Sequence, residues 1–290
     1  MDSANLQAFV KIAETGSFSL AAEQLFLTQP AISKRIKQLE SQLGSQLIDR
    51  IGKHSQLTQT GKVLLPRARQ LLQQLESIKQ QISDLEGNPM GALSMATSHH
   101  IGLHRLPPVL REFNQRYGEV ELDLNFMDSE QACRLIEHNE LELAVVTLPL
   151  KSSDKLQFKT IWHDRLVLCC SVDHPLTSIA KPQLSHLTRY AAVLPSHGTF
   201  TRDAIEHALQ AVRGKLVISM ETNYLETIKM MVSVGLGWSI LPQSMMDDSL
   251  FQVPLGEFRS SRQLGIVLNR QRSLSKAASA MLEMIEKFSN

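Results

Sequence analysis

The feature that most constrains this chain is a pattern of short helices and a tight turn near its N-terminus. Apolar residues recur at helical spacing within residues 6–13, and Gly16 stops that first helix. Ser17 or Ser19 can cap the helix that follows, because a serine hydroxyl accepts a hydrogen bond from a free backbone N–H group. Thr28 is a good N-cap for a third helix, and Pro30 falls in its first turn, where a missing N–H costs little.

The predicted third helix has one apolar face and one polar face. Ile32, Ile36, Leu39 and Leu43 form the predicted buried stripe, while Gln, Ser, Lys and Arg side chains face outward. In a helix-turn-helix the second helix of the pair meets the DNA, where Gln and Arg can read base edges and Lys and Ser can bind phosphates. The pattern by itself also fits a three-helix bundle with a solvated basic face.

The predicted DNA-binding residues come from these helices and from a wing-like hairpin after Gly44. Basic residues outnumber acidic ones between residues 28 and 55, so a local positive patch is expected. The predicted set is Ser17, Thr28, Gln29, Pro30, Ser33, Lys34, Arg35, Lys37, Arg50, Lys53 and His54.

The segment from Leu6 to Gly61 resembles, without gaps, the winged helix-turn-helix of the LysR-type transcriptional regulators. It carries that family's Ser-Phe-Ser-x-Ala-Ala, Gln-Pro-Ala-x-Ser, Leu-Glu-x-x-Leu-Gly and Leu-Thr-x-x-Gly elements. Ile48 stands where Phe is usual, and Lys34 stands where Arg is common, which replaces a bidentate contact by a point charge. The resemblance implies a sequence-specific transcription regulator that binds double-stranded DNA.

Composition and charge set aside several other classes of protein. The net charge of the 290 residues is only +1, so DNA affinity has to come from the local patch. Cys133, Cys169 and Cys170 have neither metal-site nor secreted-disulfide spacing. The polar N-terminus predicts no signal peptide, and no apolar run approaches the length of a membrane span. We therefore expect a soluble, cytoplasmic protein with one small and one larger domain.

A ladder of apolar residues, spaced alternately four and three apart, follows the DNA-binding segment. This spacing keeps an apolar seam on one side of a long helix, as a coiled coil requires, and Pro66 is expected to kink its first turns. The alternative is a helix packed on its own domain. Pairing of two chains would give a homodimer, or a homotetramer, that meets a promoter site of two-fold symmetry. The predicted dimerisation residues are Leu64, Ala68, Leu71, Leu75, Ile78, Ile82 and Leu85.

The run Glu86-Gly87-Asn88-Pro89 is a helix stop and a domain boundary. The predicted domains are a winged helix-turn-helix (1–58), a linker and dimerisation helix (59–87) and an effector-binding domain (88–290). From Gly91 onward strands and helices alternate, which predicts a parallel-rich α/β architecture. The LysR resemblance implies two lobes like those of periplasmic binding proteins, with lobe one at about 91–161 plus 265–290 and lobe two at about 162–264.

Ligands of such sheets bind at the carboxyl ends of strands. Residues 97–100 follow a predicted strand and precede a helix, and residues 196–201 repeat that arrangement in the second lobe. Hydroxyls and free N–H groups at a helix start favour an anion, so the expected effector is a carboxylate-bearing metabolite. The alternative is that these polar residues only cap helices and turns. The predicted effector-binding residues are Thr97, Ser98, His99, His100, Asp128, Ser129, Ser196, Gly198, Thr199, Phe200, Asn223 and Tyr224.

Two further functions are weighed against this one. His99, His100 and His104 raise the alternative of a metal-responsive regulator, but zinc-like sites want three or four ligands and Asp128 is the only obvious carboxylate nearby. We therefore predict no metal and no cofactor, and expect the adjacent Cys169 and Cys170 to be core residues. The chain has no nucleophile elbow, phosphate loop or dinucleotide fingerprint, so no enzyme is predicted. A solute-binding protein is the alternative from another class, and the DNA-reading segment argues against it.

Overall fold

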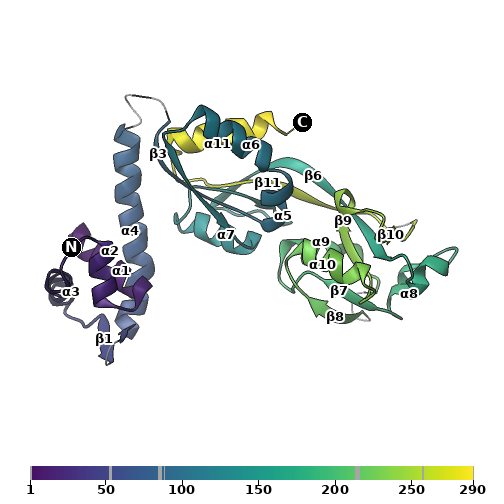
Figure 1. Cartoon of the computed structure of the whole chain (residues 1–290), viewed down its shortest axis with the longest axis horizontal. Helices are drawn as coiled ribbons and strands as arrows, with labels where there is room; N and C mark the ends of the chain where they lie inside the picture. Colours follow the sequence, from purple (N-terminus) through teal and green to yellow (C-terminus); the bar gives the residue numbers. More distant parts are fainter. Residues whose placement is uncertain are drawn as a thin grey trace. The chain divides into compact units, whose positions relative to one another are not determined.

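The computed structural model describes residues 2–51, 54–83, 87, 89–212, 216–256 and 258–289 (Figure 1). The chain forms two compact units, Met1–Glu86 (unit 1) and Gly87–Asn290 (unit 2). Unit 1 contains α1 (Ser3–Thr15), α2 (Phe18–Gln24), α3 (Gln29–Leu43), β1 (Ile48–Ile51), β2 (His54–Leu57) and α4 (Gln59–Ser83).

The ends of α2 and α3 confirm the predicted helix pair and turn. Ser17 accepts a hydrogen bond from the Leu20 amide and Thr28 accepts one from the Ala31 amide, each at 3.4 Å. Gly16 ends α1 in the left-handed region, with φ of 65°. β1 and β2 pair antiparallel, which confirms the hairpin expected after α3.

The core of unit 1 gathers one apolar face from each helix. Ile32, Ile36 and Leu39 are buried as predicted, whereas Leu43 is 37% exposed because the last turn of α3 extends past the core. Ala68 of α4 is fully buried in this same core, and Leu64 packs at its edge. The first turns of α4 therefore belong to unit 1.

The start of α4 depends on a close backbone approach. The Thr58 hydroxyl donates to the Gln46 carbonyl at 2.8 Å and accepts from the Gly61 amide at 3.0 Å. A Cβ atom on Gly61 would lie 2.2 Å from the Leu47 carbonyl oxygen, so a larger residue cannot be accommodated without a shift of the backbone. This geometry explains the Leu-Thr-x-x-Gly element of the sequence.

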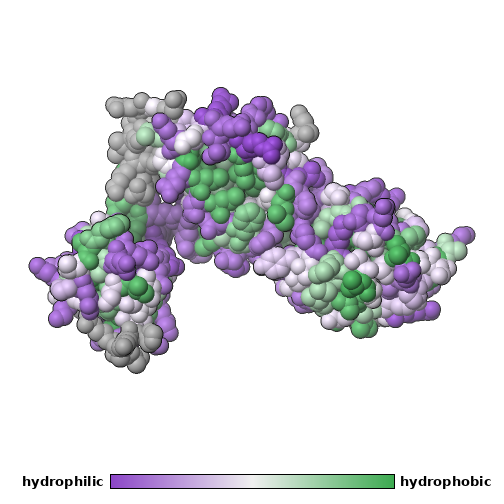
Figure 2. Space-filling model, in the orientation of Figure 1, coloured by the Kyte–Doolittle hydropathy of each residue, from purple (hydrophilic) through white to green (hydrophobic). Residues whose placement is uncertain are grey.

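The middle of α4 presents an apolar surface that unit 1 does not cover (Figure 2). Leu71, Leu75 and Ile78 are 40%, 44% and 52% exposed. Pro66 lies inside α4 without interrupting it. The side chain of Ile82, and all of Leu85, lie outside the described residues.

Unit 2 holds the remaining elements. They are β3 (Gly91–Thr97), α5 (His99–His104), α6 (Pro107–Arg116), β4 (Val120–Phe126), α7 (Ser129–Glu137), β5 (Leu143–Thr147), β6 (Leu156–Ser171), η2 (Pro175–Ser178), α8 (Leu184–Leu187), β7 (Ala191–Leu194), α9 (Phe200–Ala208), β8 (Val217–Glu221), α10 (Leu225–Ser233), β9 (Ser239–Pro242), η4 (Gln243–Met245), β10 (Leu250–Gln252), β11 (Ser260–Asn269) and α11 (Lys276–Lys287).

The main sheet of unit 2 is mixed. Its seven strands run in the order β10-β6-β11-β5-β3-β4, with β9 also paired to β6. β3 is parallel to β4 and β5, but β11 is antiparallel to both β5 and β6. The parallel-rich architecture expected from the sequence is therefore wrong for this part of the sheet. It holds for β3, β4 and β5 and for the separate parallel pair of β7 and β8.

Two long antiparallel strands, β6 and β11, connect two apolar cores (Figure 1). Trp162 of β6 packs in the first core with Leu264 of β11, whereas Leu166 packs in the second core. β6 thus passes from lobe one to lobe two within residues 162–166. β6 is long because its first half, from Leu156, pairs with β11 in lobe one.

Candidate functional site

One face of α3 in unit 1 exposes the predicted DNA-binding residues Thr28, Gln29, Pro30, Lys34 and Lys37. Ser33 is half-buried and lines, with Lys34 and Lys37, an open groove beside the start of α1. Hydroxyl, amide and ammonium groups on one exposed helix face are the donors that DNA bases and phosphates accept.

Other predicted DNA-binding residues have different surroundings. Ser17 is half-buried, and its hydroxyl caps α2. The Arg35 guanidinium donates to the Ala4 carbonyl at 3.4 Å, which holds this side chain against α1. The side chains of Arg50 and His54, and all of Lys53, lie outside the described residues.

In unit 2 a small pocket lies between the two lobes. Its cavity volume is about 40 Å³, which is room for about three waters. The walls come from segments that directly follow β3, β4, β7 and β8, so the carboxyl ends of parallel strands from both lobes meet here. The predicted effector-binding residues that line it are Ser98, His99, His100, Asp128, Ser129, Thr199 and Asn223.

Five predicted effector-binding residues are not in this lining: Thr97, Ser196, Gly198, Phe200 and Tyr224. Thr97 is fully buried, and its hydroxyl donates to the Val145 carbonyl at 2.9 Å within the sheet. Tyr224 is half-exposed and packs edge-on against the ring of His99, with centroids 4.6 Å apart. Position after a strand therefore predicted the segments that border this pocket, but not which of their side chains line it.

Seven further residues line the pocket but were not predicted from the sequence as effector-binding residues: Met127, Glu130, Thr147, Pro195, Thr201, Leu225 and Arg262. Arg262 of β11 is 5% exposed, and its Nε donates to Asp164 at 2.9 Å. Its Nη2 lies 2.8 Å from the same carboxylate but forms no well-directed hydrogen bond. Burial lowers the pKa of this guanidinium, and the Asp164 charge opposes that effect. Arg262 is thus a buried cation at the pocket, and its charge is paired with that of Asp164.

Polar contacts between the two lobes border the pocket. Asn223 donates through Nδ2 to Asp128 at 2.8 Å. The Phe200 amide, at the start of α9, donates to the Glu130 carboxylate. Burial raises the pKa of Glu130, and the hydrogen bond from Phe200 opposes that rise. The helix start at which the sequence predicted an effector anion therefore already binds a carboxylate of the chain itself.

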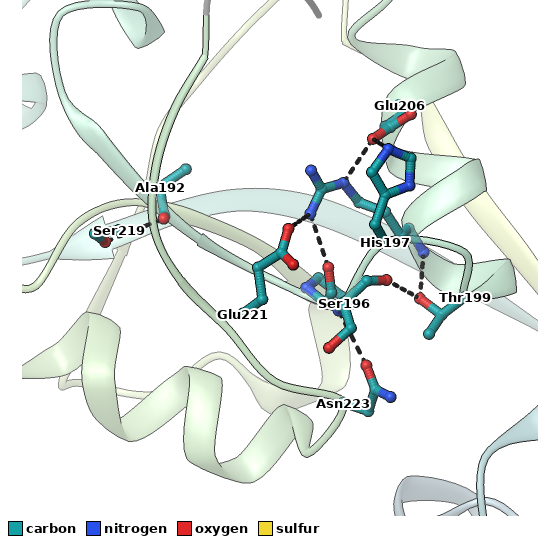
Figure 3. A network of polar contacts seen from close by, with 10 residues as sticks. Ala192, Ser196, His197, Thr199, Glu206, Ser219, Glu221 and Asn223 are labelled. Atoms are coloured by element: carbon teal, nitrogen blue, oxygen red, sulfur yellow. Dashed lines mark hydrogen bonds and ion pairs between the residues drawn. The ribbon is translucent and has the colours of Figure 1, made fainter.

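A buried network supports the lobe-two wall of the pocket (Figure 3). Arg202 is 3% exposed and donates to Glu206 at 2.8 Å and to Glu221 at 3.0 Å. The Ser196 amide donates to the side-chain oxygen of Asn223 at 3.0 Å. These bonds fix the segment before α9 relative to the segment before α10, which together form that wall.

A second polar cluster joins α5 to α10 beside the pocket. His100 Nδ1 and His104 Nε2 lie 3.3 Å and 2.9 Å from the same oxygen of Glu226. The hydrogen bond with His100, more than any other cause, lowers the pKa of Glu226 to about 2, while burial lowers the pKa of His100. His99 is not part of this cluster, because its ring packs against Tyr224 and Phe126. The grouping of three histidines considered from the sequence is therefore wrong for His99, and it lacked Glu226.

The three cysteines are buried and free. Burial raises the pKa of Cys133 and Cys169 to about 12 and that of Cys170 to about 11, so all three are protonated at neutral pH. This confirms the expectation that Cys169 and Cys170 are core residues.

Family matches span both units of the chain. Residues 3–62 match the family described as "Bacterial regulatory helix-turn-helix protein, lysR family". Residues 86–289 match the family described as "LysR substrate binding domain". The chain belongs to the LysR family of transcriptional regulators. As a LysR-family regulator it binds DNA through unit 1 and has an effector-binding domain in unit 2, as the resemblance implied.

Relatives of this LysR-family chain carry regulatory names. The "HTH-type transcriptional activator CmpR" of Synechocystis sp. is 33% identical over 235 residues, which are 81% of this chain and 77% of the relative. The "RuBisCO operon transcriptional regulator" of Allochromatium vinosum is 27% identical over 285 residues, which are 97% of this chain and 94% of the relative. These names do not favour the solute-binding or the metal-responsive alternative.

Solved structures share the fold of this LysR-family chain. A full-length OxyR variant from Pseudomonas aeruginosa has a TM-score of 0.71 at 22% identity and covers 100% of this chain and 94% of its own. CbnR "complexed with the target DNA complex" has a TM-score of 0.71 at 18% identity and covers 99% of this chain and 100% of its own. No helix in the part of the chain that the structure describes is long and apolar enough to cross a membrane.

Proposed function

We propose that this LysR-family regulator binds promoter DNA as a homodimer through the exposed face of α3, and that a small effector in the pocket between the lobes controls it. One observation supports the effector site above all. Polar residues from the carboxyl ends of strands in both lobes line a single pocket. A ligand held by both walls binds one arrangement of the lobes better than another, and this difference in affinity is what allows a ligand to shift an equilibrium.

We propose a small metabolite that carries a carboxylate and at least one hydrogen-bond donor. The Arg262 cation and the hydroxyl of Ser98, which both line the pocket, suit the carboxylate. Asp128 and Glu130 line the same pocket and accept hydrogen bonds, so the ligand must also donate to them. Hydroxy acids and amino acids combine both properties. Because the closed pocket has room for only about three waters, a larger effector requires the lobes to part.

The proposed dimer uses the exposed part of α4. Leu71, Leu75 and Ile78 follow the coiled-coil spacing and are not covered by unit 1, whereas Ala68 is already buried within unit 1. A two-fold dimer predicts a two-fold symmetric promoter site, and pairs of dimers would form a tetramer. We propose that the protein acts in the cytoplasm, where bacterial DNA lies, and that its pocket serves binding and not catalysis.

The DNA-binding part of the proposal is tested by Ser33→Ala and Lys34→Ala. Each should weaken binding to a promoter duplex, measured by fluorescence anisotropy, while the circular dichroism of the protein is unchanged. Lys155→Ala in unit 2 is the matched control and should bind like the natural chain. Unchanged affinity in both α3 variants would refute the assignment of α3 as the recognition helix.

The effector is tested by a thermal-shift screen of the full-length protein against small carboxylic, hydroxy and amino acids. A ligand at about one hundred times its Kd should stabilise the protein by about 2.7 kcal/mol. The shift should disappear in Arg262→Met, which is compared with its own melting temperature without ligand. An equal shift in Arg262→Met would place the ligand elsewhere.

The dimer is tested by sedimentation of a Leu75→Gln, Ile78→Gln double variant. Loss of these apolar side chains should lower the association constant, because they supply the seam. Val63 is 65% exposed on α4 but lies off the seam, so Val63→Gln is the control. Association of the double variant equal to that of the control would show that α4 does not pair through this seam.

A further inference from the structure

Three metal-ligating side chains converge beside the pocket from different lobes. His100 and His104 are four residues apart on α5 of lobe one, which places both rings on one helix face, with centroids 4.7 Å apart. Glu226 is in the first turn of α10 of lobe two. Histidine, cysteine and acidic side chains can all bind metal ions, and among the described residues these three are the group close enough to hold one ion. Their ligand atoms all lie within 4.8 Å of one another.

The two separations between histidine and glutamate are close to those around a small divalent ion. Zinc binds histidine nitrogen at about 2.0–2.1 Å and carboxylate oxygen at about 2.0–2.2 Å, so two ligands of a tetrahedral ion lie about 3.3–3.5 Å apart. The separation of His100 Nδ1 and Glu226 Oε1 is 3.3 Å, and that of His104 Nε2 and the same oxygen is 2.9 Å. A shift of a few tenths of an ångström would open the second contact to the tetrahedral separation. Rotation of an exposed histidine and a half-exposed glutamate can supply such a shift.

We propose that His100, His104 and Glu226 bind one divalent transition-metal ion, with zinc as the best match, and that this ion joins the two lobes. Two imidazoles and one carboxylate are a common three-residue zinc set, and they leave the fourth position to water. His104 is 50% exposed and Glu226 is 37% exposed, so an ion and its water can reach the site from solvent. All three residues belong to unit 2, and the site does not depend on the identity of the effector.

The charges around the cluster also suit a metal ion. Glu226 contributes a carboxylate, and the Arg262 guanidinium, whose charge acts on His100, is paired with Asp164 at 2.8 Å. A doubly charged ion would therefore meet an acidic ligand and an arginine whose charge is already offset.

Such an ion would act on the effector pocket directly. His100 is both a proposed ligand and part of the pocket wall, and Leu225 of that wall precedes Glu226. Because the ligands come from both lobes, the ion binds the closed arrangement and stabilises it by its binding free energy. Metal binding and effector binding are then thermodynamically coupled, and each changes the affinity of the other by the same factor.

The test uses the full-length protein without a polyhistidine tag, treated with EDTA and then dialysed free of it. Cobalt(II) chloride is titrated while the visible absorption of bound cobalt is recorded, and zinc chloride is then added in competition. We expect saturation at one cobalt per chain, displacement by zinc, and a zinc-dependent rise in melting temperature. His104→Gln and Glu226→Gln should each weaken binding at least about 100-fold, beyond the loss typical of changes outside the coordination shell.

His99→Gln is the matched control, because His99 lies on the same helix but its ring packs against Phe126 and Tyr224. This variant should bind cobalt like the natural chain. Circular dichroism establishes that each variant is folded. The proposal is overturned if the natural chain shows no saturable cobalt band. It is also overturned if both ligand variants keep the band, or if His99→Gln loses it as they do.

Discussion

At the scale of single residues, Phe26 is a strained position in unit 1. It lies in the turn between α2 and α3 with φ of 53°, and it is 96% exposed. The left-handed region costs an ordinary residue about 1–2 kcal/mol, whereas asparagine tolerates it better. Phe26→Asn should therefore raise the free energy of unfolding of unit 1 by up to about 1 kcal/mol, since almost no packing is lost. Urea denaturation followed by circular dichroism measures the change.

Phe26→Ala is the control for this prediction. Alanine removes the ring but keeps the penalty for a left-handed backbone, so its stability should stay near that of the natural chain. A less stable Phe26→Asn protein would contradict the strain argument. Reduced DNA affinity in both variants would show that the ring contributes to DNA binding despite its cost to stability.

His174 gives stability a dependence on pH. It is 8% exposed, and its Nδ1 accepts a hydrogen bond from the Leu176 amide at 3.1 Å. Burial lowers the pKa of His174 below its ordinary value of 6.5. Below pH 6.5 His174 is therefore protonated more readily in the unfolded chain than in the folded chain. Stability falls as pH decreases through this window and stops falling once the folded form is also protonated.

His174→Asn should flatten this dependence. The side-chain oxygen of asparagine can still accept from the Leu176 amide, but it does not titrate. The melting temperatures of the two proteins at a series of pH values between about 5 and 7.5 give the comparison. Parallel curves would show that His174 does not contribute. Titration of other histidines is common to both proteins and cancels in the difference.

The residue scale also shows what sequence could predict. Ser17 and Thr28 were predictable caps, because a cap and the amide it accepts from lie within three residues of one another. Glu130 and Glu226 were not, because their partners are 70 and 126 residues away in the chain. Local patterns identify the segments that border the pocket, whereas the polar contacts beside it depend on how the lobes pack.

At the scale of elements, β6 and β11 carry a buried ion pair where they pass between the lobes. Asp164 and Arg262 are register partners on these strands, and both side chains are 4% exposed. Removing one partner of a buried pair leaves an uncompensated charge and typically costs about 3–5 kcal/mol. Arg262→Met should therefore destabilise unit 2 by that amount. Urea denaturation followed by the fluorescence of the two tryptophans measures it.

The double variant Asp164→Leu, Arg262→Met distinguishes charge from packing. Replacing both partners by apolar residues removes the uncompensated charge, so the loss should be much smaller than in Arg262→Met alone. A double variant that is as unstable as the single one would show that packing of the arginine matters more than its charge.

The same two strands limited the prediction of elements from sequence. Alternation of strands and helices correctly indicated an α/β unit, in which helices such as α7 and α10 follow strands. Alternation does not reveal that β6 and β11 pair antiparallel through both lobes, because the two strands lie about 100 residues apart in the chain.

At the scale of the whole molecule, a net charge of +1 means that DNA attraction comes from a few contacts and not from overall charge. The logarithm of the DNA-binding constant K falls linearly with the logarithm of the salt concentration, and each phosphate contact adds about 0.9 to the steepness of this slope. Lys34→Ala removes one proposed contact from each DNA-binding head. If a dimer binds with both heads, the slope should decrease by about 1.8, against about 0.9 for a single bound head.

Fluorescence anisotropy on one two-fold symmetric promoter duplex, at several salt concentrations, measures this slope. Lys155→Ala in unit 2 has the same overall charge as Lys34→Ala. A change in slope that appears in Lys34→Ala but not in Lys155→Ala therefore reports a local contact. An unchanged slope would mean that Lys34 does not touch phosphate. A decrease of only about 0.9 would keep the contact but place only one head on the DNA, and the α4 pairing would then not position both α3 helices on one site.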